Sequence, residues 1–300
     1  FDASIYANMG EMDNKGVDAN LEYQTRIGNK VGLRLFGNLT YSKNKIVFRD
    51  EPAMQYAYQK SEGTRYGEFY GYIAEGYFQS EEEIKKSPRQ MRELAPGDIK
   101  YKDLNDDGVI DANDQCYLGK SWFPSWSYGM GFNINYHNFD LALFFQGVSD
   151  VSIMANGGSI DTGNGDWGAS GVGIVPFTGM GLNPSNVITK ALDRWTADNP
   201  RADAWYPRMT ANATTNDNNY VNSTHWLKDG SYLRLKQASL GYTLENKKLM
   251  DKGIEYLYFY LSGQNLLTFS KFKLWDPELG SNGAKYPLSR MVTLGMRVSF

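Results

Sequence analysis

Residues 292–300 read Val-Thr-Leu-Gly-Met-Arg-Val-Ser-Phe, and every second side chain in this stretch is apolar, up to the final aromatic. A period of two residues is typical of a β-strand with one apolar face and one polar face. The same alternation occurs at 17–27 and 31–41, joined by Gly28-Asn29-Lys30, and again at 128–136. A link this short between two alternating segments is typical of a β-hairpin. The sequence therefore predicts an all-β fold.

Seven strands of this kind are expected along the chain. They lie near 17–27, 31–43, 126–137, 139–149, 230–244, 255–268 and 287–300, and the long connections fall at 44–124, 151–228 and 269–286. Short and long connections alternate, as they do in transmembrane β-barrels with short periplasmic turns and long extracellular loops. If the C-terminus is periplasmic, counting the strands back from it places every long loop on the extracellular side. A soluble β-sandwich has no reason to sort its loops by length in this way.

The composition agrees with a barrel and excludes several other classes. The chain has 300 residues, 31 glycines and 14% aromatic residues, which is typical of a sheet-rich protein with many turns. Its longest apolar runs are about five residues, far below the roughly 20 that a membrane-spanning helix needs. With a net charge of −3, the chain has no overall positive charge to attract the phosphates of a nucleic acid, so we expect no nucleic-acid partner. The chain starts at Phe1 with no signal peptide, which favours a mature or truncated chain, and its one cysteine, Cys116, excludes an internal disulfide.

An acidic segment at 103–114 matches the twelve-residue calcium loop, with a glycine at its sixth position and oxygen ligands at the required spacing. Aspartate replaces the usual glutamate at the last position and has a shorter arm. The alternative is a turn held by its own side-chain to backbone hydrogen bonds. We expect a calcium ion that makes the loop rigid, with these ligands: Asp103, Asn105, Asp107, the Val109 carbonyl, Asp111 and Asp114.

Aromatic residues crowd the long loops and their junctions with strands. Their flat faces suit contacts with a sugar, a peptide or a partner protein, although an interfacial aromatic girdle and ordinary protein packing are the alternatives. The candidate ligand or partner contacts are Trp122, Trp126, Trp167, Trp205, Tyr206 and Trp226.

Two helices are expected within the loops. Ser80 followed by three glutamates has capping-box spacing and predicts a short helix near 81–87. An apolar stripe of Val187, Ile188, Ala191, Leu192 and Trp195 predicts an amphipathic helix at about 186–196.

No motif points to catalysis, and we expect no enzyme activity. The glycines of Gly163 to Gly168 match a dinucleotide-binding pattern, but they lie in a long loop with no helix directly after them. The only histidines are His137 and His225, the first at a hairpin turn and the second in a loop.

Several stretches together resemble the SusC/RagA family of TonB-dependent outer-membrane transporters of Bacteroidota. They are 96–114, 127–132, 138–147, Asn14 to Asp18, Tyr232 to Lys236, Asn265 to Phe269 with Asp276-Pro-Glu278, and the terminal Phe300. The resemblance covers essentially the whole chain and identifies it with the C-terminal portion of a barrel of 22 strands. It implies that a plug domain and a TonB box belong to a part of the protein outside this chain.

The resemblance implies energy-coupled import of an oligosaccharide or an oligopeptide. The implied partners are a SusD-like surface lipoprotein, TonB-ExbB-ExbD acting through the absent N-terminal part, and outer-membrane lipid. A terminal aromatic also resembles the assembly signal of outer-membrane barrels, which assigns that role to Phe300. The rival interpretations are a passive porin and a secreted β-rich protein that binds or degrades glycans.

Overall fold

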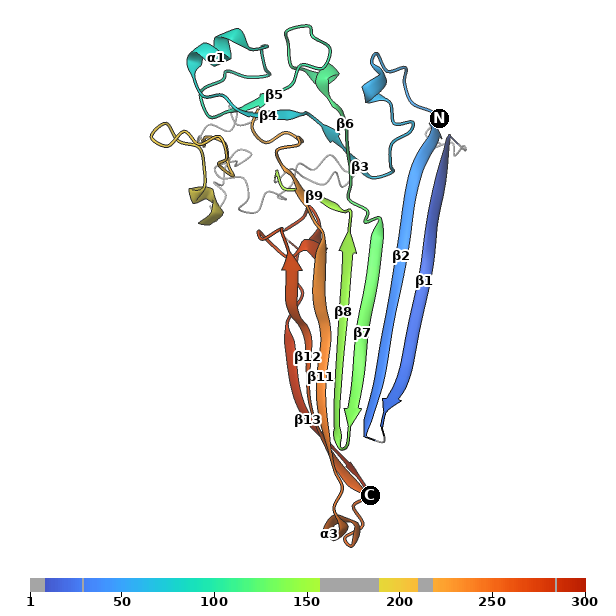
Figure 1. Ribbon diagram of the computed structural model, residues 1–300. Helices are drawn as coiled ribbons and strands as arrows, with labels where there is room; N and C mark the ends of the chain where they lie inside the picture. The colour runs from blue at the N-terminus through green and yellow to red at the C-terminus, as the bar shows by residue number, and fades with distance from the viewer. Residues whose placement is uncertain (1–8, 29, 157–188, 210–217, 284) are drawn as a thin grey trace, which may run out of the picture.

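A computed structural model gives the fold and describes residues 9–28, 30–156, 189–209, 218–283 and 285–300. Seven long strands form one antiparallel sheet in the order β1-β2-β7-β8-β11-β12-β13 (Figure 1). Their bounds are β1 Gly10–Ile27, β2 Val31–Arg49, β7 Trp126–Tyr136, β8 Phe139–Ser149, β11 Tyr232–Leu244, β12 Tyr256–Ser270 and β13 Met291–Ser299. Within the described residues the edge strands β1 and β13 each have one neighbour in this sheet, so the sheet is open at both sides.

The first hairpin is longer than the alternation indicates. β1 begins at Gly10 instead of 17, and β2 runs on to Arg49 instead of 43. Gly16 permits this pairing, because a Cβ there would lie 2.3 Å from the carbonyl oxygen of Tyr41. Residues 10–16 are mostly polar on both faces, so no period of two marks them as a strand.

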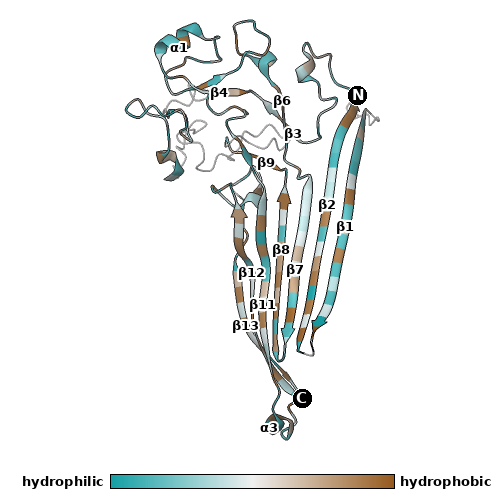
Figure 2. Ribbon diagram, viewed as in Figure 1, coloured by the Kyte–Doolittle hydropathy of each residue, from teal (hydrophilic) through white to brown (hydrophobic). Residues whose placement is uncertain are grey.

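The register places the apolar residues of all seven strands on one face. Tyr23 lies opposite Leu35, and Leu35 lies opposite Phe132. Farther along, Leu240 pairs with Leu261, which pairs with Leu294. The opposite face is mainly polar and carries, among others, Glu22, Gln24, Arg26, Arg34, Asn38, Asn133, Asn135, Gln146, Ser239 and Ser262. Figure 2 shows the resulting change of hydropathy from residue to residue along the strands.

The apolar face has the height of a bilayer core. Trp126 contacts Tyr41 at one end, with ring centroids 4.4 Å apart, and Phe139 contacts Tyr242 at the other, at 4.7 Å. Trp126 and Tyr136 bound β7, which gives about 34 Å along the strand at about 3.4 Å per residue. At the usual barrel tilt of about 40° this corresponds to a height of about 26 Å, close to the apolar band of outer-membrane barrels. The chain thus forms part of the wall of an antiparallel transmembrane β-barrel.

Two long loops fold together above one end of the sheet. We call this unit the cap, meaning the described residues of 50–125 and 150–231. It contains β3 (Glu68–Gly71) paired with β6 (Cys116–Ser121), β4 (Ala74–Tyr77) with β5 (Ile99–Tyr101), and β9 (Ser152–Met154) with β10 (Leu227–Asp229). Short 3-10 turns occur at η1 (Ala57–Gln59), η2 (Ala112–Asp114) and η3 (Thr189–Leu192), and a fourth, η4 (Pro277–Leu279), lies outside the cap in the last loop.

One of the two expected loop helices is present. α1 (Glu81–Lys86) begins where predicted, and the Ser80 hydroxyl accepts a hydrogen bond from the Glu83 amide. The prediction of a helix at 186–196 is wrong for the described residues 189–196, where only the 3-10 turn η3 forms. The backbone of Trp195 and Tyr206 pairs instead, which draws the chain out of a helical path. Val187 and Ile188 lie outside the described residues. A further helix among the described residues, α3 (Lys247–Met250), is in the turn between β11 and β12.

Among the described helices, none is long and apolar enough to cross a membrane.

Candidate functional site: the cap and its acidic loop

The first half of the acidic loop is closed by its own side chains. Asp103 Oδ2 accepts a hydrogen bond from the Gly108 amide at 2.8 Å, and Asp107 Oδ1 accepts one from the Val109 amide at 2.8 Å. Asn105 Oδ1 accepts another from the Asp107 amide at 3.1 Å. Gly108 has a φ of 81°, so the tight ring requires a residue without a Cβ there.

The second half ties the ends of the loop together. Asp114 is fully buried, and its two oxygens accept hydrogen bonds from the amides of Leu104 at 2.7 Å and Asp111 at 2.8 Å. Asp111 Oδ1 in turn accepts from the Asn113 amide at 2.7 Å. Both carboxylates therefore have backbone partners, as expected for the alternative of a self-bonded turn.

One carboxylate oxygen remains without a partner. Asp103 Oδ1 is buried and has no hydrogen bond, although a buried acceptor normally has one. A cation would satisfy this oxygen, and the oxygen-only ligand set of the loop suits calcium. Within the described part of the chain, however, no three His, Cys, Asp or Glu side chains are grouped to hold a metal. A calcium ion here would therefore need the Asn105 amide oxygen and the Val109 carbonyl as ligands.

The acidic loop is anchored in the rest of the cap. The amide of Arg89 donates to the Gly108 carbonyl at 3.0 Å, and the amide of Ile110 donates to the Arg89 carbonyl at 2.7 Å. The Ile110 side chain is buried in the cap core. The Tyr58 hydroxyl also donates to the Asn113 carbonyl at 2.7 Å. A change in the rigidity of the acidic loop would therefore affect the rest of the cap directly.

An aromatic core holds the two cap loops together. Trp226 contacts Tyr206 and Tyr220, with ring centroids 5.7 and 5.3 Å apart. Residues from the first loop, Tyr77 and Tyr101 among them, belong to the same cluster. The two loops therefore share one hydrophobic core.

A buried polar seam runs beside this core. Asp98 has no exposed surface and pairs with Arg208, whose Nε lies 2.6 Å from Asp98 Oδ1. The same carboxylate accepts a hydrogen bond from the Asn219 side chain at 2.7 Å, and Asn218 donates to the Ile99 carbonyl at 3.0 Å. Because these partners come from the two different loops, the seam fixes how the loops meet.

The structure separates the candidate aromatic contacts into three groups. Tyr206 and Trp226 are fully buried, so the expectation that they contact a ligand or partner directly is wrong; they are core residues of the cap. Trp205 is partly buried beside Lys228, whose Nζ lies 5.2 Å from the indole centroid. Trp122 and Trp126 are exposed, at 49% and 37%. Trp167 lies outside the described residues, as does the glycine-rich stretch 163–168.

The third long loop is tied to the sheet by ion pairs from β11, in which a buried arginine makes the shortest contacts and Lys236 lies 3.9 Å from Glu278. Arg234 on β11 is 1% exposed, and its Nη2 lies 2.6 Å from Asp276 Oδ1. Its Nε lies 3.4 Å from Glu278, which also accepts a hydrogen bond from the Tyr232 hydroxyl at 2.9 Å. The sequence marked these residues only as family motifs, and the ion pair between them is a feature that sequence reasoning missed.

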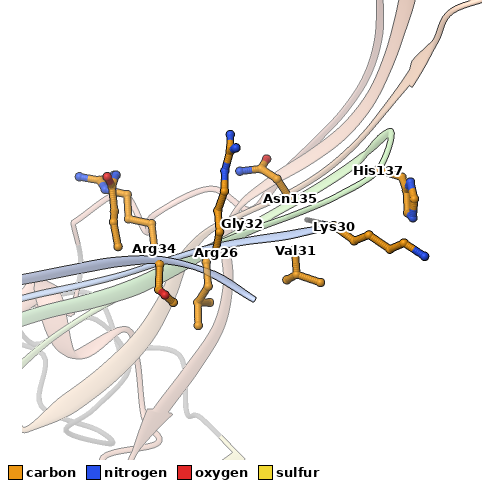
Figure 3. Close-up of a pocket in the computed structure, with 10 residues that line it drawn as sticks. Arg26, Lys30, Val31, Gly32, Arg34, Asn135 and His137 are labelled. Atoms are coloured by element: carbon orange, nitrogen blue, oxygen red, sulfur yellow. The ribbon is translucent and has the colours of Figure 1, made fainter. Parts of the chain in front are cut away.

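At the other end of the sheet, a hollow of about 680 Å³ lies at the turn between β1 and β2 (Figure 3). Its lining includes Arg26, Lys30, Arg34 and His137. In Figure 3, Arg26 and Asn135 point to one side of the sheet and Val31 to the other, in agreement with the alternation of the strands. Arg26 and Arg34 thus lie on the polar face at this end, where Arg34 pairs with Glu22 at 2.8 Å.

Comparison with known proteins gives a consistent set of relatives, although no family model matches the chain. TonB-dependent receptor P3 of Formosa agariphila is 26% identical over 99% of this chain and 30% of the receptor. TonB-dependent receptor P26 of the same organism is 28% identical over 98% of this chain and 30% of the receptor. The chain thus spans about 30% of the length of the curated relatives it matches.

Solved structures show the same fold. The RagAB peptide transporter matches with a TM-score of 0.68 at 21% identity, over 99% of this chain and 30% of that chain. The RagAB peptide importer in its closed-closed state matches with a TM-score of 0.66 at 23% identity, over 98% of this chain and 30% of that chain.

Proposed function

We infer the function from a resemblance that the comparisons confirm: over its whole length, the chain is similar to TonB-dependent receptors of the SusC/RagA type. We propose that it supplies part of the barrel wall and extracellular cap of an active importer in the outer membrane. Energy would come from TonB-ExbB-ExbD, acting on a plug encoded outside these residues. The proposed cargo is an oligopeptide or an oligosaccharide, and a SusD-like lipoprotein would cover the cap.

One observation carries this proposal. A single apolar face crosses all seven strands at bilayer height, while the opposite face is polar and the large loops gather at one end. A sheet of a secreted protein would have to cover an apolar face of this size with protein. In a barrel wall the lipid covers it, and the polar face lines the interior.

Uptake measurements in cells that produce the full-length protein test the proposal. Cells should take up labelled oligopeptide or oligosaccharide only when the gene is intact and TonB is present. Uptake that survives loss of TonB would favour the passive porin. Recovery of the protein in the soluble fraction without detergent would favour the secreted glycan-binding or glycan-degrading protein.

We propose that the lipoprotein binds to the cap. Because the buried polar seam holds the two cap loops together, a deletion within either loop is a poor test of this binding. Deleting 196–224 would remove Tyr206, Arg208, Asn218 and Asn219, which hold the other loop in place. Loss of the partner after such a deletion would report only a collapsed cap. Substitutions of exposed side chains are therefore the better probe.

A calcium ion in the acidic loop remains part of the proposal. Its support is the partnerless Asp103 oxygen and the ligand spacing of the loop. Bound there, the ion would neutralise carboxylates and stabilise the contact with Arg89 and the Ile110 anchor.

A further inference from the structure

The lipid-facing wall has a notch with a glycine at its centre. Gly37 on β2 pairs with Leu21 on β1 and with Met130 on β7, so the middle of this apolar row has no side chain. Leu35 and Leu39 lie above and below it on β2, and Tyr23 and Tyr128 flank it on the neighbouring strands. Together they line a hollow of about 780 Å³.

The backbone does not require glycine at this position. Gly37 lacks the positive φ that favours glycine elsewhere in the chain. A Cβ built on it would meet only the carbonyl oxygen of Gly129, at 3.5 Å, which is ordinary van der Waals contact. A side chain would fit here, and its absence is what leaves the wall hollow.

The notch is complete within this chain. Its floor strand β2 is paired with both β1 and β7 from Val31 to Tyr41, a stretch that includes the notch. Strands supplied by the rest of a barrel would adjoin β1 and β13 and would not cover β2. The hollow therefore does not arise from an unfinished edge.

We propose that the notch binds an acyl chain of an outer-membrane lipid. This rests on the proposed barrel function, because the notch continues the face that the barrel turns to lipid. Leu35 and Leu39 lie about 14 Å apart along β2, and the lining comes from three neighbouring strands, so the hollow is a shallow apolar depression in the wall. A flexible hydrocarbon chain adapts to such a depression and restores the dispersion contacts that a void forfeits.

Other occupants fit the notch less well. A second barrel would contact the wall as another outward-curved sheet and would bridge across the depression, leaving the void in place. The Tyr128 hydroxyl is already used, donating to the Tyr232 carbonyl at 3.3 Å. An occupant rich in polar groups would find few partners on this face, where leucine and methionine side chains predominate and Asn20 and Asn38 belong to the opposite face.

Photo-crosslinking tests the proposal on the full-length protein in nanodiscs of phosphatidylethanolamine that carries a diazirine in one acyl chain. Adducts mapped by mass spectrometry should be several-fold more abundant on Tyr23, Leu35 and Tyr128 than on Leu261 and Leu294. Gly37→Leu should reduce them to the level of the surrounding face. The matched control Val292→Leu adds bulk to the same face outside the notch and should leave them unchanged.

A second variant keeps the test valid if Gly37→Leu fails to fold. Ala19→Leu fills the notch from β1, opposite Leu39, and should lower the same adducts if its heat-modifiable migration shows a folded barrel. Equal labelling over the whole face, or enriched labelling that persists in both filled variants, would overturn the proposal and leave the importer function standing. Notch residues that stay unlabelled in a protein that runs as a dimer would replace lipid with a second barrel. No adducts anywhere on the apolar face would overturn the barrel function as well.

Discussion

Arg234 is a single side chain on which the placement of a whole loop depends. Arg234→Met would remove the charge that Asp276 and Glu278 share, which leaves the partly buried Asp276 without its cation and Glu278 with only the more distant Lys236, at 3.9 Å. Breaking a buried pair in this way costs about 3 kcal/mol, at the low end of the usual range because both acids keep some solvent. Trypsin should therefore cut faster after Lys271 and Lys273 in the variant, as local opening of the loop becomes easier.

The matched control for this experiment is Arg201→Met. Arg201 also pairs with two aspartates, Asp193 at 2.8 Å and Asp203 at 3.0 Å, but it is exposed. Such pairs contribute about 0–1 kcal/mol. Equal trypsin sensitivity in the two variants would show that Arg234 does not hold the loop.

His225 makes the cap sensitive to acid. Its Nε2 donates to the Trp205 carbonyl at 3.2 Å, and its ring packs against Trp226 at 4.6 Å. Burial, with a further contribution from the Lys228 ammonium, lowers the pKa of His225 from 6.5 to about 4. The unfolded cap therefore binds a proton below about pH 6.5, while the folded cap does not until about pH 4.

This difference in proton binding sets the direction in which the stability of the cap changes with pH. Because the unfolded state binds more protons between these values, the stability of the cap should fall as the pH drops from about 6.5 to about 4, by about 3 kcal/mol. Tryptophan fluorescence during urea unfolding at several pH values measures the change. His225→Phe should weaken the pH dependence in this window, whereas His137→Phe, at an exposed hairpin, should keep it. A wild-type cap of constant stability across the window would contradict the assignment.

At the scale of elements, the acidic loop gives a direct test of calcium. If the ion binds, calcium should raise the midpoint of cap unfolding and a chelator should lower it, since a ligand that binds only the folded state stabilises it. Asp103→Asn should abolish the response. Asp106→Asn is the matched control: it makes the same charge change in the same loop, at a residue that is not a predicted ligand and whose φ of 58° asparagine tolerates. A wild-type protein that does not respond to calcium would favour the self-bonded turn.

The last strand gives a second test at this scale. Phe300 follows β13 directly and is 90% exposed. Deleting Phe300 in the full-length protein should lower its amount in the outer membrane, because the terminal aromatic is the proposed assembly signal. Phe300→Tyr keeps an aromatic end and should restore the amount. Unchanged levels and unchanged heat-modifiable migration of the deletion variant would exclude the role.

Over the whole molecule, the sequence predicts the wall far better than the cap. Alternation marks β7 and β13 because lipid and a polar interior impose opposite demands on successive side chains. Ser80 predicts α1 for an equally local reason, since its hydroxyl caps an amide three residues on. These signals act between near neighbours in sequence.

The cap is held together by contacts between residues far apart in the sequence, and such contacts leave no local sequence pattern. Trp226 looked like a surface candidate because tryptophans in loops often bind ligands, yet it packs with residues of another loop and is buried. The backbone hydrogen bond from the Trp195 amide to the Tyr206 carbonyl likewise takes the place of the predicted helix. Asn218 and Asn219 carried no sequence signal at all, because their partners lie more than a hundred residues away, at Asp98 and Ile99.

An exposed aromatic patch at the base of the cap is the surface best prepared for a partner. Tyr66 stacks on Phe123 at 5.9 Å, and Trp122 meets Phe123 at 5.8 Å. The rings close over Gly67, where a Cβ would lie 2.6 Å from the Phe123 ring. Beneath them, Arg65 donates to the Phe123 carbonyl at 3.2 Å and to Asp150 at 3.0 Å. The patch is therefore held rigid before anything binds, which lowers the entropy cost of association.

Rigid exposed aromatics are the residues that most often dominate interface energies. Trp122→Ala combined with Phe123→Ala should therefore reduce co-purification of the SusD-like lipoprotein with the full-length protein. Tyr136→Ala is the matched control, since Tyr136 is equally exposed but lies at the opposite end of β7, beyond the reach of an extracellular partner. If the lipoprotein co-purifies fully while uptake of cargo falls, the patch contacts cargo instead. If neither changes, the aromatics belong to the interfacial girdle, and the partner surface lies elsewhere on the cap.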